Sequence, residues 1–235
     1  MESEKFESIW NLAEDWIEEP NIRRKGISGV IRTTFDHKIV YVKKQTNHFH
    51  YSLRHPFGRA TAQREAEAIT AIKLLGITVP NVLYIKTKKV GNEQRTLMVT
   101  SELHNYLPLE DFVTQDIKCD ERENVMLMRA LARTLVILHR NRWQHSCLNA
   151  KHIFACRKGG GFQVALIDLE KMRRRLSIHK ASKHDLDQLS RHQKCWSEES
   201  WAQFLSEYRR ELYLKPAYRC HDRRDEKRLL IDGSI

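Results

Sequence analysis

HRNRWQHSCLNAKH, residues 139–152, is the stretch of sequence that decides the fold, together with IDLE at residues 167–170. The first stretch is a polar loop centred on His145 and Cys147, and it follows apolar residues at helical spacing. Asp168, in the second stretch, directly follows a short apolar strand. A carboxylate at such a strand end is well placed to hold a metal ion that bridges phosphate groups. We therefore expect the chemistry of the chain to lie around these two stretches.

A lysine and a glutamate upstream of the loop form a predicted ion pair. Lys43 directly follows the β-forming run at 39–42, and its neighbour Lys44 should point to the opposite face of the strand. Glu65 shares the apolar face of a helix predicted at 61–75. Because an unpaired buried carboxylate is costly, it needs a cationic partner, and Lys43 is the candidate. The alternative is a solvated strand end and a glutamate that interacts with the helix dipole.

Gly26-Ile27-Ser28-Gly29 is predicted to be a glycine turn between two strands. Glycines allow the backbone to approach a ligand closely, and free N–H groups in such a turn can hold phosphate. Gly26, Ser28 and Gly29 are therefore candidate phosphate-binding residues. An ordinary hairpin is the alternative for so short a turn.

The order of these signals is glycine turn, strand lysine, helix glutamate, histidine-centred loop and strand-end aspartate, which is typical of the protein-kinase fold. The expected class is α+β and two-lobed, a single minimal kinase-like domain over 1–235, with a small five-stranded N-lobe at 1–103 and a mostly helical C-lobe at 104–235. Predicted helices outside 61–75 are at 3–18, around 128–138, at 183–195 and at 198–214. Predicted strands lie within 21–44, at 81–90, at 94–101 and on both sides of 159–161, and residues 47–59 are a basic, aromatic connector.

Composition sets the broad class of the protein. The chain has 235 residues with 41% hydrophobic and 30% charged residues, an ordinary soluble balance. No apolar run approaches the roughly 20 residues that span a bilayer, and the N-terminus lacks the basic start of a secretory signal. Five cysteines without a CxxC pair do not predict a disulfide framework. We therefore expect a cytoplasmic protein.

The net charge of +11 suggests an acidic partner. Nucleic acid, anionic lipid headgroups and a phosphorylated sugar all fit this charge, and a solubilising surface is the plainer alternative. Basic residues gather at 23–25, 173–175 and 219–228. Nucleic-acid binding rests on charge alone with no motif behind it, so nucleic acid is not expected as a partner.

The same motifs, taken at full length, resemble the lipopolysaccharide kinase family of InaA and WaaP type. They are EEPNIRRKGISGV at 18–30, YVKK at 41–44, RHPFGR at 54–59, RE at 64–65 and LIDLEK at 166–171. QHSCL at 144–148 with KHI at 151–153 is similar to the InaA branch in particular. The resemblance extends over about residues 16–213, nearly the whole chain.

This resemblance implies an ATP-dependent sugar kinase that phosphorylates a heptose of the lipopolysaccharide core or a related sugar. The implied partners are ATP and a phosphorylated sugar or lipopolysaccharide core, with a peripheral contact at the inner face of the inner membrane as an option. The implied nucleotide-binding residues are Gly26, Ser28, Gly29, Lys43 and Glu65. The implied metal ligands are Asp168 and His152. The implied catalytic residues are Lys43, His145 and the residue that occupies the position of the catalytic aspartate, Cys147.

The loop triplet, His152 and Tyr41 depart from the kinase pattern, and the bulk of Tyr41, where protein kinases keep a small alanine, could narrow the nucleotide site. Kinases have His-Arg-Asp where this chain has His145-Ser146-Cys147, and the aspartate orients and accepts the proton of the attacking hydroxyl. A thiol is a weaker proton acceptor near neutral pH, so a pseudokinase that binds nucleotide or a partner without efficient transfer is the alternative function. His152 replaces a metal-binding asparagine, and because imidazole is a poor ligand for Mg²⁺, the cofactor is ATP with either Mg²⁺ or Mn²⁺.

The cysteine also supports a metal or redox hypothesis. His145, Cys147, His152 and Cys156 have the spacing HxCx4Hx3C, although zinc sites usually begin with two to four residues between the first ligands. The neighbours His145, Lys151 and His152 could lower the pKa of Cys147 and make it peroxide-sensitive.

Asp185 is expected near the start of the helix predicted at 183–195. There it would either cap the helix or brace the catalytic loop.

Overall fold

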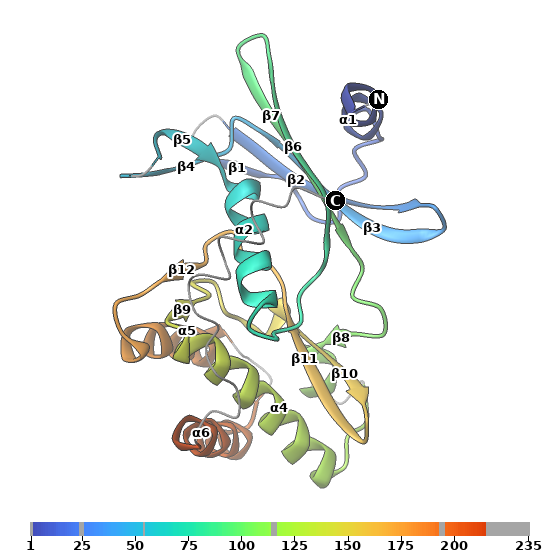
Figure 1. Cartoon of the computed structure of the whole chain (residues 1–235). Coiled ribbons are helices and arrows are strands. Elements are labelled where there is room, and N and C mark those ends of the chain that lie inside the picture. Colours follow the sequence, from blue (N-terminus) through green and yellow to red (C-terminus); the bar gives the residue numbers. More distant parts are fainter. Residues whose placement is uncertain (1, 24–25, 54, 114–116, 193–195, 215–235) are drawn as a thin grey trace. The chain divides into compact units, whose positions relative to one another are not determined.

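Figure 1 shows a computed structural model of the chain, which describes residues 2–23, 26–53, 55–113, 117–192 and 196–214. The basic residues at 24–25 and 219–228, and Cys195 and Cys220, lie outside these ranges. The fold is mixed α/β and forms two compact units. One contains the residues up to 69 with 80–104, and the other contains 70–79 with the residues from 105 onward.

A five-stranded antiparallel sheet forms most of the first unit, in the order β1-β2-β3-β7-β6. Its strands are β1 (Asn21–Arg23), β2 (Gly26–Phe35), β3 (Lys38–Thr46), β6 (Val82–Val90) and β7 (Glu93–Ser101). The strands predicted at 81–90 and 94–101 are confirmed. In β3, Val40 and Val42 are buried on one face, and Lys43 projects from the other because side chains alternate along a strand.

Helix α1 (Glu2–Trp10) is shorter than the helix predicted at 3–18. Phe6 and Ile9 pack into the sheet core with Val42, and there the helix ends. The indole of Trp16 also packs against this core, but Trp16 pairs with Ile31 as an isolated antiparallel bridge. The helix was predicted too long because apolar residues of α1 and of the extended segment around Trp16 both face the same core. Their combined spacing resembles that of one longer helix.

A hairpin that the sequence analysis missed lies between β3 and helix α2 (Thr61–Lys73). It consists of β4 (Phe49–Ser52) and β5 (His55–Ala60), which fall within the predicted connector at 47–59. Gln45 fixes the start of α2: its Nε2 donates to Thr61 Oγ1 at 2.8 Å, and its Oε1 accepts from the backbone N–H of Ala62 at 2.9 Å. These buried bonds satisfy groups at the helix N-terminus that have no partner within the helix.

The second unit is built around helix α4 (Glu121–Arg140), whose capping box joins Asp120 and Glu123. The apolar residues predicted at helical spacing around 128–138 are confirmed as its buried face, with Met128, Leu131, Leu135 and Leu138 all buried. Helix α6 (Glu198–Tyr213) packs on α4, and ion pairs join Arg129 to Glu207 and Arg133 to Glu211. The other helices are α3 (Leu109–Val113), the 3₁₀ turn η1 (Ala150–His152) and α5 (Ile178–His192).

Short sheets complete the second unit. One has the order β11-β10-β8, with β8 (Leu107–Pro108), β10 (Ile153–Lys158) and β11 (Gly161–Leu166), which confirms the hairpin predicted around 159–161. The other pairs β9 (Trp143–Gln144) with β12 (Arg173–Arg174). Thr78 bridges to Ala165, so residues 70–79 pack with this unit. Within the described residues, no helix combines the length and hydropathy that crossing a membrane requires.

Candidate functional site

Lys43 and Glu65 form a mostly buried ion pair in the first unit. Lys43 lies on β3 and Glu65 on α2, and Lys43 Nζ donates to Glu65 Oε2 at 2.5 Å. Their side chains are 14% and 7% exposed. The pairing predicted from strand alternation and helical spacing is confirmed. Because both charges have lost most of their water, removal of either one would leave a poorly solvated charge behind.

Lys44 points to the opposite face of β3, as predicted. Its ammonium group donates to the backbone carbonyl of Leu12 at 2.7 Å and lies 5.8 Å from the centre of the Trp16 ring. Burial lowers the pKa of Lys44 below its ordinary value. Lys44 is therefore part of the packing around residues 12–16, and Lys43 is the lysine available to the candidate site.

The segment from Gly26 to Gly29 is not a turn, because the structure places it inside strand β2. A Cβ at Gly26 would lie 2.4 Å from the Asn47 carbonyl oxygen, and a Cβ at Gly29 would lie 2.5 Å from the Trp16 ring. Ser28 is buried, and its hydroxyl accepts a hydrogen bond from Gln45 at 3.0 Å. The glycines are therefore required by close packing of backbone and indole, a requirement that a short motif cannot distinguish from phosphate binding.

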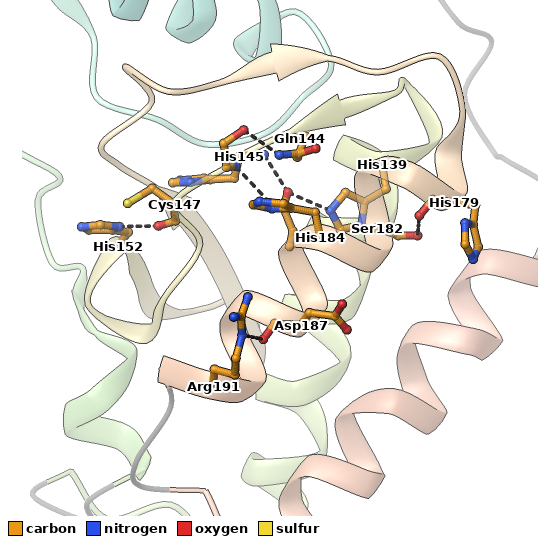
Figure 2. A network of polar contacts seen from close by, with 12 residues as sticks. His139, Gln144, His145, Cys147, His152, His179, Ser182, His184, Asp187 and Arg191 are labelled. Carbon is orange, nitrogen blue, oxygen red and sulfur yellow. Dashed lines mark hydrogen bonds and ion pairs between the residues drawn. The ribbon is translucent and has the colours of Figure 1, made fainter.

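Asp185 braces the loop that carries His145 and Cys147 in the second unit. It is fully buried, and its carboxylate accepts the backbone N–H of His145 at 2.6 Å and that of Ser146 at 2.9 Å. His139 Nε2 lies 3.2 Å from the same carboxylate, and its Nδ1 lies 2.8 Å from the Tyr208 hydroxyl. In Figure 2, dashed lines link His139 and His145 through this network. The brace is confirmed and the cap is wrong, because α5 begins at Ile178.

Burial and hydrogen bonding around this loop determine the protonation of Asp185 and His145. Burial alone would raise the pKa of Asp185, but the hydrogen bond and charge of His139, together with the backbone N–H of His145, hold that pKa below its ordinary value. Burial lowers the pKa of His145, so its ring is neutral at pH 7. His145 Nε2 lies 3.0 Å from the Ile167 carbonyl oxygen. Because a carbonyl can only accept, Nε2 carries the proton, and His145 thereby fixes the backbone next to Asp168.

Cys147, His152 and Asp168 come together at the end of this loop. One donor atom from each lies within 4.8 Å of the other two. His152 Nε2 is 3.4 Å from Asp168 Oδ2, and the His152 Nδ1 atom is 2.7 Å from the Cys147 carbonyl oxygen. Asp168 has a φ of +56°, a left-handed conformation that is uncommon outside glycine and is often found at functional sites.

The predicted zinc set is only partly assembled. Within the described part of the chain, the group that could share a metal ion contains Cys147 and His152 but neither His145 nor Cys156. Asp168 is the third member instead. Sequence spacing missed it because the antiparallel hairpin β10–β11 returns the chain to the loop, and Ile167 N–H donates to the His152 carbonyl at 3.0 Å.

The thiol of Cys147 is less acidic than an ordinary cysteine. Burial and the nearby Asp168 carboxylate raise its pKa, and they outweigh Lys171 and Lys151, which act in the opposite direction. Lys171 Nζ lies 3.9 Å from Cys147 Sγ, a contact that the sequence analysis did not find. The predicted lowering of the pKa by cationic neighbours is therefore wrong, because half-burial dominates.

Comparisons with known proteins give one consistent result. The lipopolysaccharide kinase (Kdo/WaaP) family matches residues 7–208. The protein InaA of Escherichia coli (strain K12) is 33% identical over 207 residues, which is 87% of this chain and 95% of InaA. A solved structure of WaaP in complex with acyl carrier protein has a TM-score of 0.64 at 21% identity, covering 88% of this chain and 82% of that one. The structural likeness supports a kinase-like fold.

Proposed function

Because the chain belongs to the lipopolysaccharide kinase (Kdo/WaaP) family, we propose that it is an ATP-dependent kinase. It would transfer the γ-phosphoryl group to a heptose, or a related sugar, of the lipopolysaccharide core. The observation that carries this proposal is the buried ion pair between Lys43 and Glu65, since a lysine fixed by a helix glutamate is the phosphate-binding element of kinases. The two-lobed division at residues 103–104 belongs to the same proposal, and ATP together with a reduced thiol fits the cytoplasm.

On the nucleotide side, Lys43 would contact the phosphate oxygens, and Glu65 would hold its ammonium group in place. Gly26, Ser28 and Gly29 would line the phosphate site without free N–H groups of a turn, because this part of β2 pairs with β1 and β3 and the Ser28 hydroxyl is bonded to Gln45. A divalent cation would neutralise charge on the phosphates when bound, and Asp168 and His152 would hold it. One carboxylate and one imidazole fit Mn²⁺ better than Mg²⁺, which prefers oxygen ligands.

On the acceptor side, Cys147 occupies the position of the kinase aspartate. Because its pKa is raised, the group is a neutral thiol at pH 7 and a poor proton acceptor. His145 cannot replace it as a base, since its Nε2–H points to the Ile167 carbonyl and its ring is fully buried. We assign His145 a positioning role. Phosphoryl transfer depends mainly on positioning and electrostatic stabilisation, so the reaction would be slow but retained.

A pseudokinase is the second candidate, and the raised pKa of Cys147 favours it. Such a protein would bind nucleotide through Lys43 and would not transfer phosphate efficiently. The two candidates differ in a single measurable quantity, the rate of transfer to a sugar acceptor.

The test is phosphate transfer from γ-labelled ATP to heptose-containing core oligosaccharide, with Mn²⁺ or Mg²⁺ and the full chain. We expect slow transfer by the wild type and a loss of about 10²-fold or more in Lys43→Ala, because transition-state charge loses its partner. Cys147→Asp should raise the rate by about 10²-fold, as expected when a general base is supplied. Lys38→Ala, an exposed lysine on the same strand, is the matched control and should change nothing.

If both the wild type and Cys147→Asp bind nucleotide but neither transfers phosphate, the result would support the pseudokinase instead. A Cys147→Asp rate at or below that of the wild type would contradict the role given to this position.

A further inference from the structure

The end of the loop offers three chemically different donors, a thiol, an imidazole and a carboxylate. We propose that Cys147, His152 and Asp168 form a three-ligand site for a thiophilic divalent cation of the zinc type. The site does not require nucleotide. It differs from the cation site of the proposed kinase in its sulfur ligand and in the metal that it would prefer.

The spacing of the donors fits one ion. The donor atoms lie within 4.8 Å of one another, and His152 Nε2 and Asp168 Oδ2 are 3.4 Å apart. Two ligands on a tetrahedral zinc ion, with bonds of about 2.0–2.2 Å, are separated by roughly 3.4 Å. Cys147 Sγ lies within 4.8 Å of both atoms, so sharing the ion would require it to approach by about 1 Å.

The imidazole of His152 is already oriented for coordination. Its Nδ1 atom is 2.7 Å from the carbonyl oxygen of Cys147, so Nδ1 must donate its hydrogen to that oxygen. In the neutral ring Nε2 then carries a lone pair, and this atom faces Asp168. Ligating histidines usually have their second nitrogen fixed by a carbonyl or carboxylate in this way. Here the carbonyl belongs to another residue of the proposed site, so loop and ligand are held together.

The donor chemistry selects the metal. Magnesium prefers near-octahedral oxygen ligands, and this set supplies one carboxylate. Thiolate and imidazole favour Zn²⁺, and thiols are deprotonated outright when a metal binds, so the thiol proton would leave to solvent. Three protein ligands would leave a fourth position for water, as in zinc sites of the open type.

The site is partly open to solvent, and a cationic side chain lies beside it. Asp168 is 33% exposed on its side chain, whereas His152 is 10% exposed. Lys171 is exposed, and its ammonium group lies 3.9 Å from Cys147 Sγ. If the proposed function is correct, zinc would compete with Mn²⁺ for Asp168 and His152 and inhibit transfer, and this consequence rests on that function.

The first experiment is a Co²⁺ titration of the full metal-free chain without nucleotide. We expect one Co²⁺ per chain, displaced by Zn²⁺, with a thiolate-to-cobalt charge-transfer band in the near ultraviolet. The band should vanish in Cys147→Ser, and the Co²⁺ affinity should fall by at least about tenfold in His152→Ala and Asp168→Asn. Cys119→Ser is the matched control, because Cys119 is also half-buried but contacts Arg157 and lies outside the donor group, and it should retain the band.

A second measurement uses only the wild type, so it does not depend on the folding of any variant. Zn²⁺ should protect Cys147 from alkylation, as measured by peptide mass spectrometry, while Cys119 stays equally reactive. Absence of the charge-transfer band, a band that survives in Cys147→Ser, or alkylation of Cys147 unaffected by Zn²⁺ would each overturn the site. Failure of phosphate transfer alone would leave these results unchanged, so the two proposals fail separately.

Discussion

Asp185 shows how much of the loop depends on one buried carboxylate. It accepts two consecutive backbone N–H groups, from His145 and Ser146, and it contacts His139 from α4. Each of these donors would be costly to leave unsatisfied in the interior. The position of the neighbouring Cys147 is therefore set from beneath the loop by a residue on α5.

Asp185→Asn should lower the free energy of unfolding by roughly 2–4 kcal/mol at pH 7, because an amide cannot accept as many hydrogen bonds and carries no charge. Since the pKa of Asp185 is below the ordinary value of about 3.9, its stabilisation is complete above that pH and disappears as pH falls through the lower folded value. Urea unfolding of the wild type and of Asp185→Asn between pH 7 and pH 3 measures the difference in their free energies of unfolding. This difference should narrow only below about pH 4.

Asp187→Asn is the control, because Asp187 is exposed on the same helix and pairs with Lys183 at the surface. It should unfold like the wild type. A gap for Asp185→Asn that stays constant down to pH 3 would show that its carboxylate is not the source of the stabilisation.

For single residues, the sequence predicts which side chains pair better than it predicts their pKa values. Lys43 and Glu65 could be paired in advance, because strand alternation and helical spacing each fix a direction. The pKa of Cys147 could not, since the lysines visible nearby in sequence act against burial and Asp168, which only the fold brings to the thiol.

Strand β2 lies between β1 and β3, and it is closely covered where its glycines lie. The Trp16 ring covers Gly29, and the backbone at Asn47 covers Gly26. Both contacts come from segments without a helix or strand pattern of their own, so the β2 glycines looked like a ligand-binding turn. The hairpin β4–β5 was missed for a different reason, because its strands have only four and six residues and β5 contains Pro56 and Gly58, which argue against a strand.

Gly29→Ala should destabilise the protein by about 1–3 kcal/mol, because the new methyl group would lie 2.5 Å from the Trp16 ring and force it to move. Thermal unfolding followed by tryptophan fluorescence measures both the loss and the displaced indole. Gly161→Ala is the control, since a methyl group there would meet Met126 at an ordinary 3.5 Å. Equal melting temperatures for the two variants would contradict the packing account of Gly29.

The whole molecule carries a net charge of +11, and its described surface includes the exposed arginines of β12, Arg173 and Arg174. The family points to a lipopolysaccharide-related substrate, which would be rich in anionic groups. A positive field raises the local concentration of such partners, but it does not select among them. The mixed α/β fold could be predicted from motif order, whereas the packing of residues 70–79 with the second unit has no signal in the sequence.

The purified chain should bind vesicles that contain phosphatidylglycerol at low salt, and binding should fall steeply as NaCl rises towards 0.5 M. The Debye length is about 10 Å at 0.1 M and about 3 Å at 1 M, so surface attraction is screened over this range. Co-sedimentation measures the bound fraction, and vesicles of phosphatidylcholine alone are the control. Binding that is equal on both vesicles, or insensitive to salt, would contradict an electrostatic membrane contact.

Helix α1 also has a consequence for synthesis on the ribosome. Phe6 and Ile9 are synthesised about 90 residues before Leu97 and Val99, which complete their core. At roughly 5–20 residues per second, the apolar face of this helix stays without its final partners for about 5–20 s. During that interval the nascent chain presents an amphipathic segment that a chaperone could recognise, and the first unit can close only after β7 has emerged.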